Sequence, residues 1–291
     1  MTIGKNEMFR QFRTLLILGR VSNLPTVWSN CLASWIIGGG ELQFGFLLAS
    51  LGATALYTGG MFLNDAVDSE FDRQHRRERP IPSGAIQARA VWIWGFSFLA
   101  LGICILSSFG RSTAILALIL AGTIVLYDAI HKAITFSPVV MAACRFWLFV
   151  CVASATPNGV TGLSIWSALV LSAYIVGLSY IAREESLRGP LRYWPCYFLG
   201  FPIVLAWIVN AEDFRPRVML FSAIFLGWVF YCLRHSLWTS QRNIGRTVSG
   251  LLAGIVFVDW LAVAIVPFHF GLGFAIFFGV ALFFQRFIPA T

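Results

Sequence analysis

The stretch Asn64-Asp65-Ala66-Val67-Asp68-Ser69-Glu70-Phe71-Asp72 follows directly on an apolar segment at about 45–65 and precedes a strongly basic loop. Five of the 13 acidic residues of the chain fall between positions 65 and 78, although only 12% of the chain is charged. On a helix, the three aspartates of the stretch recur at i, i+3 and i+7, so their carboxylates share one face, which Asn64 flanks. Like charges placed in this way repel each other unless a cation lies between them. The stretch therefore predicts a cation site at the end of an apolar helix.

Mg²⁺ suits such a site, because it takes one or two protein carboxylates and draws its other ligands from water and phosphate. The basic residues that follow suit a polyanion on the other side of the ion; they are Arg73, Arg76, Arg77 and Arg79. The alternative is a solvated loop of mixed charge without chemistry, which is the commoner case in soluble proteins. Carboxylates near hydrocarbon are costly and usually have a function, so the position favours a metal–diphosphate site with Asp65, Asp68 and Asp72 as ligands.

The composition excludes an ordinary soluble domain. The mean hydropathy is +0.78, 58% of the residues are hydrophobic, and the chain contains 27 Phe and 11 Trp. Repeated apolar stretches of this kind predict an all-α, polytopic transmembrane bundle, and we expect residues 1–291 to form one integral-membrane domain. The six cysteines include no CxxC pair and read as small core side chains. The net charge of +8 follows from the placement of basic residues in loops and indicates no nucleic-acid partner.

Ten apolar segments are expected, and because the last two are joined by only three residues, a re-entrant hairpin there is an alternative; we expect nine to ten spans. The segments lie at about 22–39, 45–65, 90–109, 112–130, 137–155, 163–182, 194–210, 216–234, 249–267 and 269–287. With ten crossings, 17 Lys and Arg residues fall on the side of the aspartate-rich stretch and 3 on the opposite side. By the positive-inside rule, the stretch then faces the cytoplasm, and we expect a multi-pass protein of the cell inner membrane.

Further polar features end other segments on the same side of the membrane. They are Arg79-Pro80-Ile81-Pro82-Ser83-Gly84, Tyr127 with Lys132, and the i, i+4 pair Tyr180 and Glu184. Each has a structural alternative: a simple turn, a topology anchor, interfacial aromatic residues, or a local ion pair of Glu184 with a neighbouring arginine. Two charges lie inside segments. Arg145 is a candidate phosphate contact, and Asp259 bonds a neighbouring helix or lines a cavity.

These residues, in this order, resemble the UbiA-type intramembrane prenyltransferases. The resemblance rests on Asn64-Asp65-x-x-Asp68-x-x-x-Asp72, on Arg79-Pro80 with Pro82-Ser83-Gly84, and on Tyr127 followed by Lys132, and it covers most of the chain from Gly19 onward. It implies a helical bundle, usually of nine spans, around a cavity open to lipid. It also implies that a polyprenyl diphosphate is held by Mg²⁺ on two acidic motifs. By this resemblance Asn64 and the three aspartates hold the metal and diphosphate, Arg79 and Lys132 contact the diphosphate, and Asn23 lies near the acceptor.

The chain departs from the family pattern at the second acidic motif. Two aspartates four apart are usual there, whereas this chain has Tyr180-Ile181-Ala182-Arg183-Glu184-Glu185. We expect Tyr180, Arg183 and Glu184 to contact substrate, with Glu184 as the remaining metal ligand and the Arg183 cation standing in for a metal charge. The altered motif is similar to that of the EboC-like branch of the family. A second departure is the tenth apolar segment.

Two functions follow from these features. The first is transfer of a prenyl group from a polyprenyl diphosphate to an unidentified lipophilic or aromatic acceptor in the membrane. Metal and cationic side chains would stabilise the departing diphosphate, and aromatic faces would stabilise the allylic cation. The aromatic candidates, for which packing is the alternative role, are Trp28, Trp35, Phe62, Phe146 and Trp147. The second function is binding or translocation of a prenyl lipid without catalysis, which the altered second motif favours.

Overall fold

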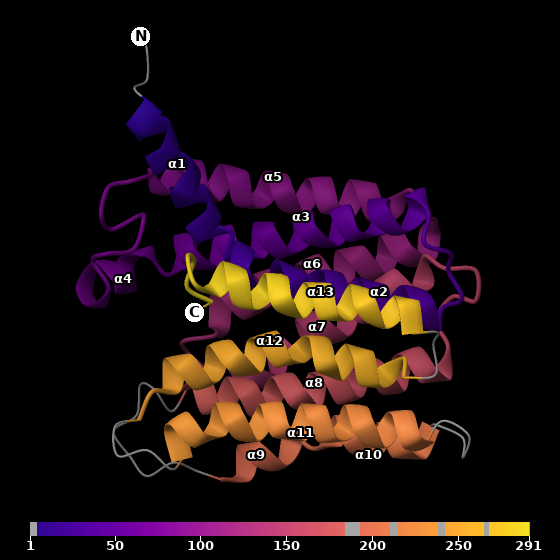
Figure 1. Ribbon diagram of the computed structural model, residues 1–291. Coiled ribbons are helices and arrows are strands. Elements are labelled where there is room, and N and C mark those ends of the chain that lie inside the picture. The colour runs from indigo at the N-terminus through magenta and orange to yellow at the C-terminus, as the bar shows by residue number, and fades with distance from the viewer. Residues whose placement is uncertain (1–4, 184–192, 210–214, 238–241, 265–267, 291) are drawn as a thin grey trace.

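The computed structural model describes residues 5–183, 193–209, 215–237, 242–264 and 268–290, and the described residues form helices and no strands. Figure 1 shows the long helices lying side by side, roughly parallel or antiparallel. The elements are α1 (Lys5–Leu18), η1 (Val21–Asn23), α2 (Leu24–Ile37), α3 (Phe44–Val67), α4 (Ser69–His75), α5 (Ala88–Ser107), α6 (Arg111–Ile130), α7 (Ser137–Ser154), α8 (Gly162–Arg183), α9 (Trp194–Phe198), α10 (Phe201–Val209), α11 (Arg215–Leu237), α12 (Ile244–Ala262) and α13 (Phe268–Gln285).

Seven of the described helices are long and apolar enough to cross a membrane, namely α3, α5, α6, α7, α8, α11 and α12. A span needs about 20 residues, and α2 has 14. The expected segment at 194–210 is divided into α9 and α10, where Pro202 near the start of α10 limits backbone pairing. The polytopic helical bundle is thus confirmed, whereas nine to ten crossings stay a prediction.

Of three groups of buried apolar side chains, the two larger ones hold most of the bundle together. One group centres on α8, α11 and α12, and the other on α2, α3 and α6. Helix α7 contributes to both, through Phe149 to the first and Leu148 to the second. Close backbone approach joins α3 to α5: a Cβ atom at Gly59 would lie 2.8 Å from the carbonyl oxygen of Gly95. Glycine at this contact lets the two helices meet without an intervening side chain.

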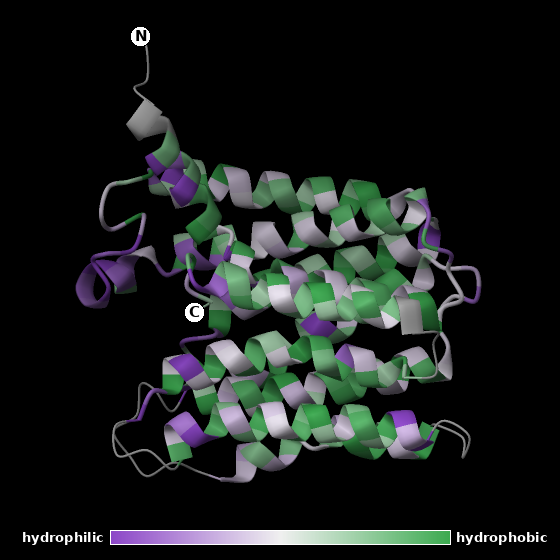
Figure 2. Ribbon diagram, in the orientation of Figure 1, coloured by the Kyte–Doolittle hydropathy of each residue, from purple (hydrophilic) through white to green (hydrophobic). Residues whose placement is uncertain are grey.

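The aspartate-rich stretch lies at one end of the bundle. In Figure 1, α4 projects from that end, and α1 and the end of α13 lie there as well. Figure 2 shows hydrophilic residues concentrated at this end and apolar residues along the helices. The bundle brings the start of α2, the end of α3 and the end of α6 together at this end, beyond the apolar parts of the helices.

Single cysteines at opposite ends of the bundle should report its orientation. In a variant without the six native cysteines, a cysteine at Ser83 should react with a membrane-impermeant maleimide from the cytoplasm, and one at Asn158 from the other side. Both positions are exposed, and the 17-to-3 charge asymmetry motivates the direction. Labelling would be measured in right-side-out and inverted vesicles, and the reverse pattern would place the site on the other face.

Candidate metal–diphosphate site

The expected helical ladder of aspartates continues through a junction at its centre. Helix α3 ends at Val67 and α4 begins at Ser69, but Asp68 between them keeps a right-handed helical backbone (φ −74°, ψ −9°), and the Asp72 amide donates to the Asp68 carbonyl (2.9 Å). Asp68 lies at the junction, where its backbone amide still donates to the Asn64 carbonyl (2.9 Å). Asp65 remains close enough to both Asp68 and Asp72 for their charges to interact. The like charges therefore stay together, and separate cationic partners stabilise two of them.

Asp65 is a buried carboxylate with two arginine partners. Its side chain is 5% exposed, and its Oδ1 lies 3.0 Å from a guanidinium nitrogen of Arg79 and 3.5 Å from one of Arg20. Arg79 comes from the loop between α4 and α5. Arg20 lies in the turn before η1 and has a left-handed backbone (φ 41°). A buried carboxylate is stable only when it is paired and hydrogen-bonded, and these two turns supply the pairing.

Asp68 receives two cations from the end of α6. Lys132 Nζ lies 2.6 Å and His131 Nε2 3.2 Å from its Oδ1. Burial alone would raise the pKa of Asp68, but hydrogen bonds and charge from His131 and Lys132 hold that pKa below its ordinary value. Burial opposes protonation of His131, yet the hydrogen bond to Asp68 leaves the pKa of His131 raised. Both shifts favour the charged forms of Asp68 and His131.

Asn64 joins the first motif to Asp128 on α6. Its Oδ1 accepts from Arg20 (3.1 Å), and its Nδ2 donates to Asp128 Oδ1 (3.1 Å). Asn64 is 5% exposed and Asp128 3% exposed. Asp128 Oδ2 is buried without a hydrogen-bond partner in the described part of the chain. A buried carboxylate oxygen without a partner is uncommon and calls for an explanation, such as an ion or a water.

The remaining expected residues at this end are buried or packed nearby. Asp72 is 2% exposed on α4. Tyr127 is half-buried and stacks on His131, with ring centroids 5.2 Å apart. Lys132 lies over the Phe71 ring, 3.9 Å from its centroid. These contacts fix the ends of α4 and α6 relative to the aspartates.

The donor set fits Mg²⁺ with a diphosphate. The ion favours oxygen ligands, and the side chains of Asn64, Asp65 and Asp68 offer them, together with the free Oδ2 of Asp128. Within the described ranges, no three His, Cys, Asp or Glu side chains are arranged to hold an ion by themselves. Mg²⁺ commonly takes one or two carboxylates and completes its shell with water and phosphate. The neighbouring Arg and Lys side chains suit the phosphate oxygens.

Two other expected substrate residues lie away from the aspartates. Asn23 is buried and donates to the Ala290 carbonyl (2.9 Å) of the C-terminal segment. Arg145 donates to Asn30 Oδ1 (2.7 Å) and Thr26 Oγ1 (3.1 Å) on α2, and lies 5.7 Å from the centroid of the Tyr57 ring. The structure therefore joins Arg145 to α2 and α3, deeper in the bundle than the aspartates.

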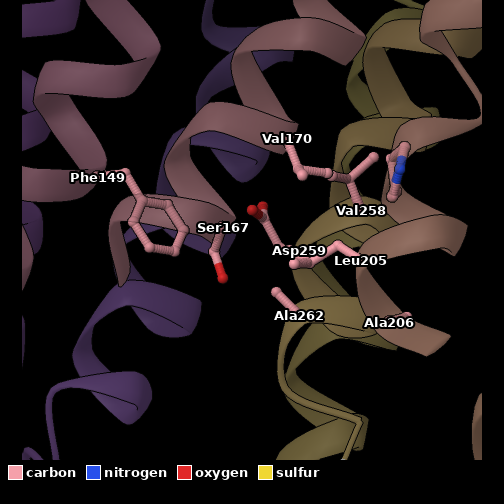
Figure 3. Close-up of a pocket in the computed structure, with 9 residues that line it drawn as sticks. Phe149, Ser167, Val170, Leu205, Ala206, Val258, Asp259 and Ala262 are labelled. Carbon is pink, nitrogen blue, oxygen red and sulfur yellow. The ribbon is translucent and has the colours of Figure 1, made fainter. Parts of the chain in front are cut away.

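Asp259 completes this interior network. Its Oδ2 accepts from Ser29 Oγ (2.5 Å) and Asn30 Nδ2 (2.7 Å), so Asn30 bridges Arg145 and Asp259. Figure 3 shows the Asp259 carboxylate in a pocket beside Phe149, Ser167 and Val170. The structure therefore confirms that Asp259 bonds a neighbouring helix, while a place on a substrate cavity stays a prediction.

The second acidic motif is only partly described. Tyr180 packs edge-on against Trp194 with ring centroids 4.7 Å apart. Arg183 donates to the carbonyls of Ile134 (3.1 Å) and Thr135 (2.6 Å) and lies 3.4 Å from Ser137 Oγ. Glu184, the expected metal ligand of this motif, lies outside the described residues. In the structure, Arg183 thus stabilises the connection that follows Lys132.

Arg183→Ala is expected to loosen this connection. The carbonyls of Ile134 and Thr135 would lose a charged donor worth about 1.5–3 kcal/mol per bond when well shielded, and less here because the site is partly exposed. Amide hydrogen exchange over 131–136 should rise, and affinity for a prenyl diphosphate should fall several-fold with unchanged Mg²⁺ dependence. Unchanged exchange with lost affinity would instead assign Arg183 directly to phosphate. Arg188→Ala, in the same basic segment, provides the comparison.

Sequence reasoning did not select three residues that the structure brings to the site. They are Arg20, His131 and Asp128. Two of them could have been selected from the sequence, because Asp128 and His131 lie between the selected residues Tyr127 and Lys132. Arg20 had none beyond its place among the N-terminal basic residues, since its contact with Asp65 spans 45 positions of the chain.

Comparisons with known proteins show what the chain is similar to. Residues 23–198 match the UbiA prenyltransferase family. A digeranylgeranylglyceryl phosphate synthase from Methanothrix thermoacetophila is 33% identical over 187 residues, 62% of this chain and 68% of that protein. A 4-hydroxybenzoate octaprenyltransferase from Idiomarina loihiensis is 24% identical over 222 residues, 74% of each chain. The chain spans less than half the length of other curated relatives that it matches, 44% and 43% for two further digeranylgeranylglyceryl phosphate synthases.

A solved structure supports the fold. The UbiA homolog from Archaeoglobus fulgidus bound to GPP and Mg²⁺ superimposes with a TM-score of 0.62 at 16% identity, covering 93% of this chain and 98% of that one. The family match extends over more than half of the chain and includes α2, with Asn23 just before it, the complete first acidic motif and the cations of α6. The chain therefore belongs to the UbiA prenyltransferase family.

Proposed function

We propose that the chain transfers a prenyl group from a prenyl diphosphate to a lipophilic or aromatic acceptor within the membrane, in a Mg²⁺-dependent reaction. The observation that carries the proposal is the set of buried carboxylates at one end of the bundle, paired with Arg20, Arg79, His131 and Lys132. Such a set costs free energy to bury. A metal and a polyanion that bind between the carboxylates and the cations would offset this free-energy cost of burial.

The residues divide into two roles. Asn64, Asp65, Asp68 and Asp72 would hold Mg²⁺, which would neutralise charge on the departing diphosphate. The cations now paired with Asp65 and Asp68 would turn to the phosphate oxygens when substrate enters. Arg79 is the arginine suited to bidentate phosphate contact, and Lys132 is a mobile point charge. The expected contribution of Glu184 to a second metal remains part of this proposal.

The chemistry requires cleavage of the allylic C–O bond, whose electron pair leaves with the diphosphate. The cations at the aspartate-rich end stabilise that leaving group. An electron pair of the acceptor then forms the new bond to the allylic carbon, and the acceptor releases a proton. A water-poor interior limits capture of the cation by water. We place the acceptor near Asn23, with Arg145 as a deeper polar contact.

The structure narrows the aromatic residues available to the cation. Trp35 is 5% exposed and packs against Phe46 and Phe109, and Phe62 is 3% exposed and packs against Phe98. Their packing favours a structural role. Three others are half-buried and remain candidates, each able to contribute about 0.5–2 kcal/mol by cation–π attraction; they are Trp28, Phe146 and Trp147.

Purified protein in lipid nanodiscs should release diphosphate from prenyl diphosphates of several lengths, only with Mg²⁺ and an acceptor. The acceptor panel should include aromatic and hydroxyl-bearing lipids. Mass spectrometry of the product would identify the bond formed. Tight Mg²⁺-dependent binding without release across the whole panel would instead support the lipid-binding function. The cytoplasmic orientation and the inner-membrane location are proposed from the charge asymmetry and tested by the cysteine labelling above.

A further inference from the structure

The chain has one carboxylate more than expected at the first acidic motif and one fewer at the second. The second motif carries Tyr180 where an aspartate is usual. At the first motif, Asp128 approaches from α6 and bonds Asn64 across the helix interface. It also lies close enough to Arg20 and Asp68 to interact with their charges. Asp128 thus belongs spatially to the aspartate-rich end although it is 60 residues beyond Asp68.

The two oxygens of Asp128 have different surroundings. Oδ1 accepts from Asn64 Nδ2 at 3.1 Å. Oδ2 is buried and has no hydrogen-bond partner among the described residues, in a side chain that is 3% exposed. Leaving a buried acceptor unpaired is unfavourable, and more so when the group is charged. This cost disappears if a ligand supplies a donor.

The Asn64–Asp128 bond has a direct consequence for the amide. Asn64 Nδ2 donates to Asp128 Oδ1, so the NH₂ group of the amide faces α6. The amide oxygen must then face the opposite way, where it now accepts from Arg20. An oxygen held in this direction is available to a cation bound beside Asp65 and Asp68. Without Asp128, the amide could turn and present its NH₂ group instead.

We propose that Asp128 is a positioning residue of the Mg²⁺–diphosphate site. It fixes the Asn64 amide with its oxygen toward the ion, and its free Oδ2 offers a carboxylate oxygen to the water molecules bound to the ion. The inference rests on the proposed function, because it needs Mg²⁺ to bind there. Carboxylates that orient ligands in this way typically change metal affinity by about 10–100-fold when removed.

Asp128→Asn is the direct test, and Asp259→Asn is a matched control. Both aspartates are buried and accept from an asparagine amide on a neighbouring helix, Asn64 or Asn30. The readout is binding of geranyl diphosphate, measured by calorimetry across a Mg²⁺ titration, together with thermal unfolding. Asp128→Asn should raise the Mg²⁺ concentration at half-maximal binding by about 10-fold. Asp259→Asn should lower thermal stability and leave that concentration within about twofold.

An unchanged Mg²⁺ midpoint in folded Asp128→Asn would overturn the inference. Wild-type protein that binds geranyl diphosphate equally well without Mg²⁺ would instead overturn the proposed function. Should Asp128→Asn fail to fold, wild-type protein loaded with Fe²⁺ in place of Mg²⁺ gives a second test. Oxidative cleavage with ascorbate and peroxide should cut the backbone at both 64–68 and 127–131. Cuts confined to 64–68 would exclude Asp128 from the surroundings of the ion.

Discussion

Asparagine in place of Asp65 is expected to lower Mg²⁺-dependent diphosphate release by about 10²–10³-fold, the loss typical of removing one preorganised electrostatic contact. The substitution keeps the size of the side chain but removes the charge that Arg79 and Arg20 now face at 3.0 and 3.5 Å. In the proposed site it also removes a metal ligand. The Mg²⁺ requirement should therefore shift together with the rate, and single-turnover kinetics in nanodiscs would measure both.

Glu70→Gln supplies the control in the same segment. Glu70 is 73% exposed and pairs with Arg73 on the surface of α4 at 2.8 Å. Exposed pairs contribute between about 0 and 1 kcal/mol, so this equal change of charge should leave rate and stability nearly unaltered. Because Asp65 is buried, thermal unfolding of both variants should be compared first. A folded Asp65→Asn protein with wild-type rate and Mg²⁺ dependence would refute the assignment of Asp65 to the site.

The sequence was sufficient to place the aspartate-rich site at one end of a helical membrane bundle. High hydropathy predicts the bundle, and carboxylates at the end of an apolar segment are unusual enough to mark a site. Arg79 and Lys132 were selected from nearby loops, and the structure places both on aspartates, at 3.0 and 2.6 Å. These contacts depend on neighbouring segment ends, which topology brings together at one face of the membrane.

Contacts between distant segments could not be read from the same pattern. The cations beside Asp68 come from the end of α6, and Arg20 reaches Asp65 from the turn before η1. Substrate contact by Arg183 stays a prediction from the sequence, and the structure adds bonds from Arg183 to the carbonyls of Ile134 and Thr135 that no sequence pattern indicated. A charge pattern predicts where a charged side chain lies, and the packing of the chain selects its partner.

Replacing Asp259 by leucine should cost about 3–5 kcal/mol of stability, the range for breaking a buried ionic network on one side. Asp259 is 1% exposed in α12. Its loss would leave Ser29 and Asn30 without their acceptor and Arg145 without a nearby negative charge. Unfolding in bicelles would measure the loss. Ser167→Ala is the control from the same pocket, because the Ser167 hydroxyl has no partner in the described part of the chain and its removal should be nearly neutral.

The double variant Asp259→Leu/Arg145→Met decides what the network contributes. If Arg145 and Asp259 act as an ionic pair through Asn30, the double variant should lose about 1–3 kcal/mol less stability than the two single variants lose in sum. Hydrogen bonds between helices in membranes average only about 0.6 kcal/mol, so a recovery below about 1 kcal/mol would reduce the network to ordinary hydrogen bonding. Strict additivity would show that the two charges are independent. A recovery near the upper value would mean that α12 and α7 are held together through α2 by opposite charges inside the membrane, beneath the metal–diphosphate site.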